Sequence, residues 1–86
     1  MSLELLRSGI DSLDIKILQL LNERAKLAAQ IGEIKNELNM SIINIEREHE
    51  ILENIVANNV GPLSDQDVRN IYTEIIRACR DLQKAR

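Results

Sequence analysis

The sequence predicts an all-α fold of one long helix followed by two shorter helices. Residues typical of turns gather in only two places along the 86-residue chain, at 39–41 and 58–62. Between these places no segment alternates apolar and polar residues with the period of two that a half-buried strand shows. The chain therefore divides into three predicted helices, over residues 3–38, 43–57 and 65–85.

Apolar residues of the first predicted helix follow alternating steps of three and four, with one position skipped. They are Leu3, Leu6, Ile10, Leu13, Ile17, Leu20, Leu27, Ile31, Ile34 and Leu38. This heptad spacing is typical of helices that pack along a shared seam. The helix would be about 54 Å long at the usual rise per residue, whereas a compact monomer of this length would measure only about 30 Å across. We therefore expect an obligate homodimer in which a second chain covers the seam.

Charged residues occupy positions where apolar residues are expected. The skipped position of the seam holds Arg24, and Lys35 lies on the same face of the helix about 16 Å further along. In the second predicted helix Glu48 interrupts the apolar stripe, with Arg47 beside it and Asn44 one turn before it. A buried cation costs several kcal/mol unless it is paired, so an anionic group should meet these cations.

Two interpretations of these charges remain open on the pattern alone. Arg24 and Glu48 would form a buried ion pair that fixes the register of a helical bundle. Alternatively, the excess of cations (Arg24, Lys35 and Arg47 against Glu48) predicts a pocket that binds a small dianion.

The third predicted helix opens with a capping box, in which Ser64 precedes Asp67 by three residues. Cys79 lies in the apolar stripe of this helix, as expected for a core residue. Gln83 lies at the edge of the same stripe.

Composition excludes several classes of protein. The net charge is -3 and aromatic residues make up 1% of the chain, which argues against a nucleic-acid partner. No apolar run reaches the length of a membrane span. One cysteine forms no intrachain disulfide, which favours a cytoplasmic location. The length favours one domain over 1–86, and the chain has no cluster of His and Cys suited to a metal.

Several stretches resemble the all-helical chorismate mutases (type II). These are 6–14, 20–24 and 31–35 in the first predicted helix, followed by 47–50, 59–63 and 75–83. The match covers nearly the whole chain, and its most specific part is the ordered set Arg7, Arg24, Lys35, Arg47, Glu48 and Gln83. The resemblance implies an intertwined dimer with two equivalent active sites that convert chorismate to prephenate. The reaction is pericyclic and needs no cofactor.

The resemblance also implies a role for each residue of the set. Arg7 and Arg24 would hold the substrate carboxylates, supplemented by Arg47. Lys35 and Gln83 would donate to the ether oxygen as its bond breaks. Glu48 would accept a hydrogen bond from the ring hydroxyl.

Two further substrate-binding positions depart from the family pattern. Asn44 stands where an Asp is common, and Cys79 stands where some members have a small hydroxyl residue.

Arg7 and Arg24 are about 25 Å apart on one straight helix, too far for one small ligand. If both serve one site, Arg7 comes from the partner chain, whose long helix then runs antiparallel. Two other functions stay open beside the mutase: a non-catalytic helical dimerisation module, and an isochorismate pyruvate lyase on the same fold.

Overall fold

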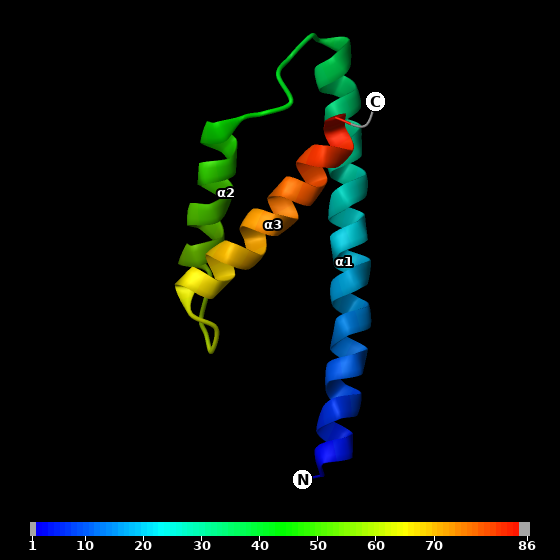
Figure 1. Cartoon of the computed structure of the whole chain (residues 1–86), viewed down its shortest axis with the longest axis vertical. Helices are drawn as coiled ribbons and strands as arrows, with labels where there is room; N and C mark the ends of the chain where they lie inside the picture. The colour runs from blue at the N-terminus through cyan, green and yellow to red at the C-terminus, as the bar shows by residue number, and fades with distance from the viewer. Residues whose placement is uncertain (1, 85–86) are drawn as a thin grey trace.

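The computed structural model describes residues 2–84, and these form three α-helices without a strand. They are α1 (Leu3–Glu37), α2 (Ile45–Ala57) and α3 (Asp65–Lys84) (Figure 1). The predicted fold class is confirmed. The second helix starts two residues later than predicted, because Asn44 is its N-cap and accepts a hydrogen bond from the Arg47 backbone N–H at 3.0 Å. The predicted end of the third helix, residue 85, lies outside the described residues.

The helix ends form where local chemistry predicts them. The Ser64 hydroxyl accepts a hydrogen bond from the backbone N–H of Asp67 at 3.1 Å, which satisfies one free donor at the start of α3. Both predicted turns contain a residue in the left-handed region, Asn39 with φ 56° and Gly61 with φ 77°. Asn and Gly are the residues that adopt this conformation most readily.

Helix α3 joins the other two helices. It packs against both α1 and α2, and across residues 2–84 these two do not pack against each other. In Figure 1 α3 crosses from the end of α2 to the upper half of α1. Because α1 packs only on α3, the burial of Ala28 and Gly32 comes from α3, whose own buried residues are Ile76 and Cys79. The small residues Ala28 and Gly32 allow the two helices to approach closely.

The leucine and isoleucine seam of α1 is not the face that packs on α3. All ten seam residues are exposed, from 48% at Ile31 to 63% at Leu20 and Leu38. Every residue from 2 to 20 is exposed, and the N-terminal end of α1 extends beyond the other two helices (Figure 1). The described chain measures 55 × 24 × 14 Å, as expected for a long helix that overhangs its own chain. None of the helices in residues 2–84 has the length and continuous apolar character needed to cross a membrane.

Candidate active site

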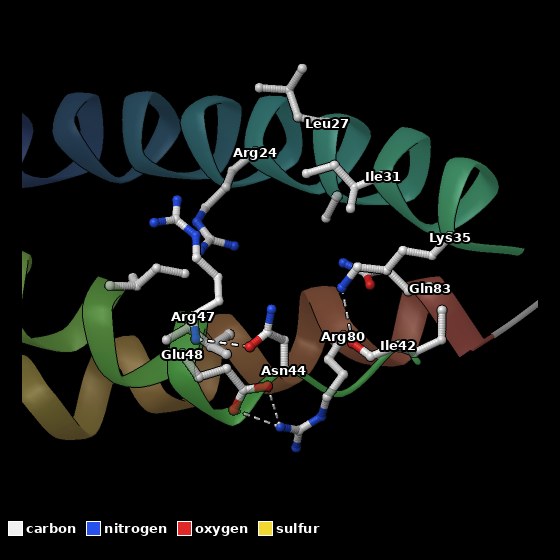
Figure 2. A pocket seen from close by; sticks show the side chains of 13 residues that line it. Arg24, Leu27, Ile31, Lys35, Ile42, Asn44, Arg47, Glu48, Arg80 and Gln83 are labelled. Carbon is white, nitrogen blue, oxygen red and sulfur yellow. Dashed lines mark hydrogen bonds and ion pairs between the residues drawn. The ribbon is translucent and has the colours of Figure 1, made fainter. Parts of the chain in front are cut away.

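A cavity of about 300 Å³ lies between α1 and α2, with α3 forming its third wall (Figure 2). Six of the eight predicted site residues line it: Arg24, Lys35, Asn44, Arg47, Glu48 and Gln83. The other lining residues are Arg80 and the apolar Leu27, Ala28, Ile31, Ile42, Ile51 and Ile76. An apolar wall with a few convergent polar groups is typical of a small-molecule site, and the volume is at the lower end of the usual range.

Helix α1 supplies two cations, Arg24 and Lys35, whose side chains extend into the space between the helices (Figure 2). Lys35 Nζ donates a hydrogen bond to the backbone carbonyl of Ile42 at 3.2 Å. Within residues 2–84 Arg24 makes no hydrogen bond or ion pair, and no carboxylate contacts Lys35. Both side chains are half-buried, so their charges are only partly screened by water.

One interpretation of the sequence paired Glu48 with Arg24. In the structure Glu48 has a different partner. Its carboxylate accepts hydrogen bonds from Arg80 Nη1 at 2.9 Å to each oxygen. The two side chains are 25% and 27% exposed. Arg80 is a lining residue for which the sequence pattern predicts no role, although its spacing of four from Ile76 and three from Gln83 places all three on one face of α3.

The start of α2 provides an amide and a third cation. Asn44 uses its side-chain oxygen to cap the helix, which leaves its amide nitrogen facing the cavity (Figure 2). The Arg47 guanidinium forms an ion pair with Glu50 one turn later, and both side chains are mostly exposed.

The ion pairs leave an excess of positive charge at the cavity. Arg80 balances Glu48, and Glu50 balances Arg47. Arg24 and Lys35 remain without a carboxylate partner in the described part of the chain. Two uncompensated cations on one wall fit a ligand that carries two negative charges.

Gln83 reaches the cavity because α1 and α3 approach closely at Gly32. A Cβ atom at Gly32 would lie 3.0 Å from Cα, Cβ and Cγ of Gln83, closer than ordinary van der Waals contact. The side-chain oxygen of Gln83 is buried and has no hydrogen-bond partner within residues 2–84.

Gly32→Ala is expected to displace Gln83 from the cavity wall and, if this cavity is an active site, to lower kcat/KM about 10- to 100-fold, since small displacements of a group that contacts a substrate are costly. Gly9→Ala is the control for helix propensity on the same helix, because a Cβ there meets nothing within 4 Å in this chain, and light scattering verifies its dimer because Gly9 lies beside the seam residues Leu6 and Ile10. Both substitutions raise helix propensity by about 0.5–1 kcal/mol. Equal kinetic parameters for the two variants would contradict this role of Gly32.

Comparison with known families identifies the chain. The sequence model of the family described as "Chorismate mutase type II" matches residues 6–84. The chain belongs to the chorismate mutase type II family. It is 49% identical over 83 residues to the bifunctional chorismate mutase/prephenate dehydratase of Aquifex aeolicus (strain VF5). The matched region covers 92% of this chain and 23% of that relative. The chain thus spans less than a quarter of the length of that curated relative.

Two solved chorismate mutases share the fold. The chorismate mutase (form II) of Thermus thermophilus is 35% identical, with a TM-score of 0.94 over 96% of this chain and 94% of that chain. The chorismate mutase of Helicobacter pylori, solved in complex with prephenate, is 34% identical, with a TM-score of 0.86 over 95% of this chain and 89% of that chain.

Two predicted site residues lie outside the cavity of this chorismate mutase type II chain. Cys79 is buried at 6% exposure and does not line the cavity, so the structure places it in the core. Arg7 is exposed near the start of α1, far along the helix from Arg24. Across residues 2–84, no three His, Cys, Asp or Glu side chains are grouped to hold a metal ion.

Proposed function

We propose that the chain is a chorismate mutase, which rearranges the dianion chorismate to prephenate on the way to phenylalanine and tyrosine. The observation that carries the proposal is the pair of cations without carboxylate partners, Arg24 and Lys35, which line the cavity together with the amide of Gln83. The family match and the similarity to a chorismate mutase solved with prephenate support the choice of substrate.

The first task of the site is to hold a flexible substrate in a compact, chair-like conformer. The planar guanidinium of Arg24 binds a carboxylate through two parallel hydrogen bonds, and Arg47 lies near enough to line the same cavity. Fixing the carboxylates at set positions removes much of the entropy that the free substrate would lose on reaching the transition state.

The second task is to stabilise the negative charge that grows on the ether oxygen as the carbon–oxygen bond breaks. Lys35 has three donors, of which one is committed to the Ile42 carbonyl, so two remain for a ligand. The amide of Gln83 supplies a further donor. Donors that are already in place before the reaction favour the transition state over the substrate.

Glu48 and Asn44 recognise the ring hydroxyl in this proposal. The ionised carboxylate of Glu48 only accepts hydrogen bonds, and the amide nitrogen of Asn44 only donates. A hydroxyl group both donates and accepts, so it satisfies the two residues together. Cys79 remains a core residue, and its free thiol supports a cytoplasmic location.

A homodimer with shared active sites completes the proposal. The seam of α1 is exposed along its whole length, and among residues 2–84 only Ala28, Ile76 and Cys79 are buried apolar residues. Such a small core does not stabilise a chain of this length. An antiparallel α1 from a second chain would cover the seam and bring its own Arg7 toward Arg24.

The purified chain is expected to be a dimer with no appreciable folded monomer. Dilution should therefore reduce the light-scattering mass and the helical circular dichroism signal together, since folding and association are coupled. A helical, cooperatively melting monomer would contradict this prediction.

The proposed reaction is tested by supplying chorismate and isochorismate separately and identifying the products. Prephenate from chorismate supports the mutase, whereas pyruvate from isochorismate identifies a lyase, and no turnover leaves a non-catalytic helical module. The mutase reaction should be unaffected by a metal chelator.

Gln83→Glu is expected to make activity depend on acid conditions. The wild-type amide donates at any pH, whereas a carboxyl group donates only when protonated. The activity of the variant should therefore rise as pH falls toward the ordinary glutamate pKa of about 4.3, and wild-type activity should vary little across neutrality. A variant whose pH profile matches that of the wild type would exclude Gln83 as the donor.

A further inference from the structure

Arg80 makes a cross-helix contact on the wall of the cavity. Its Nη1 lies 2.9 Å from each carboxylate oxygen of Glu48, so that one nitrogen holds the carboxylate symmetrically (Figure 2). Both residues line the cavity, and both side chains are about three-quarters buried, at 27% and 25% exposure. Charge-assisted hydrogen bonds are stronger than neutral ones, so this contact keeps the carboxylate turned toward Arg80, whose Nε is buried and has no hydrogen-bond partner within residues 2–84.

This contact changes what Glu48 presents to a ligand. Without Arg80, the Glu48 carboxylate would repel a dianion bound beside it. With Arg80, that charge is balanced, while each carboxylate oxygen keeps a free lone pair. The cavity therefore gains an oriented acceptor without losing its positive character from Arg24 and Lys35.

We propose that Arg80 is a positioning residue that orients the Glu48 carboxylate and thereby selects ligands that carry a hydroxyl group. The inference rests on the proposed function, because it takes the ring hydroxyl of a chorismate-like dianion as the group that Glu48 accepts.

A purely structural role for Arg80 makes a different prediction, and the chain offers a matched control. Arg69 forms a second Arg–Glu ion pair between α3 and α2, with Glu53 at 3.2 Å. It does not line the cavity. The Arg69 pair is more exposed, at 35% and 53%, so it controls for loss of an arginine ion pair between these helices. If the Arg80 ion pair served only to hold α2 on α3, its loss would lower the melting temperature and leave kcat/KM per folded dimer unchanged.

The kinetic test compares Arg80→Met, Arg80→Gln, Arg80→Lys and Arg69→Met. Loss of the Arg80 charge should lower kcat/KM about 10- to 100-fold. Arg80→Lys should recover part of the loss, and Arg69→Met should stay within about twofold of wild type. Two neutral variants are made so that the comparison does not depend on either one folding. Equal losses at Arg80 and Arg69, or no loss at Arg80, would overturn the inference.

The specificity test measures binding of two unreactive bicyclic dicarboxylates that match the compact conformer, one with the ring hydroxyl and one without it. Arg80→Met should weaken both dianions, because the Glu48 charge is no longer balanced, and should weaken the hydroxylated ligand about tenfold more than the deoxy ligand. In a Glu48→Gln background, Arg80→Met should weaken the two ligands to nearly the same extent. Equal weakening of both ligands, or an undiminished effect in that background, would overturn the role of Arg80. Failure of the wild-type dimer to bind either ligand or to consume chorismate would instead contradict the proposed function.

Discussion

Arg24→Ala and Lys35→Ala are each expected to lower kcat/KM on the order of 10²- to 10³-fold while the dimer remains folded. Removing one preorganised donor from a site that stabilises a developing negative charge typically costs this much. Neither cation has a carboxylate partner in residues 2–84, so each can interact with the substrate at full strength.

The melting temperature distinguishes catalysis from structural pairing. Removing one member of a buried ion pair destabilises a protein strongly, whereas removing a half-buried cation without a partner relieves a desolvation cost. Arg24→Ala should therefore melt at or above the wild-type temperature, whereas Lys35→Ala also loses the hydrogen bond to the Ile42 carbonyl and should melt somewhat lower. Lys26→Ala, at an exposed position of α1 outside the cavity, is the control for loss of a positive charge. Strong destabilisation with intact activity per folded dimer would favour the interaction-module alternative.

Helix number, helix order and both turns could be predicted because the signals are local. A capping serine, a turn asparagine and a turn glycine act on their own neighbours in the chain. Arg24, Lys35 and Glu48 could also be identified, since a charge within an apolar stripe stands out against the helical period. Gln83 was recognised only through the resemblance to a family, because a polar residue at the edge of a stripe is common on any amphipathic helix.

The pairing of side chains between helices could not be predicted from the sequence. Glu48 and Arg80 are 32 residues apart, and the only pairing considered from the sequence pattern, in one of its two interpretations, was that of Glu48 with Arg24. The choice depends on how α3 crosses the other helices, which follows from the fit of small residues at Ala28 and Gly32. The heptad pattern identified the leucine seam, whereas α3 packs on a different strip of the same helix.

Mixed dimers provide the second large expected effect, which tests whether two chains share each site. Arg7 and Arg24 are about 25 Å apart along α1, and only Arg24 lines the cavity. Arg7→Ala and Arg24→Ala homodimers should therefore each be nearly inactive if every site combines one residue from each chain. Unfolding the two variants together and refolding an equal mixture should restore about a quarter of wild-type activity.

The value of a quarter follows from the symmetry of the dimer. Random pairing makes about half of the dimers mixed, and each mixed dimer has one site with both arginines and one site with neither. If both arginines came from the same chain, no refolded site would contain both, and activity would stay at the level of the single variants. Subunit exchange is verified separately with chains of two different masses, so that the absence of recovered activity reflects the site and not a failure to mix. Recovery in exchanged dimers would therefore show that Arg7 reaches the site from the partner chain. This is the arrangement that the separation of Arg7 and Arg24, about 25 Å along one helix, requires, because one small ligand cannot span that distance.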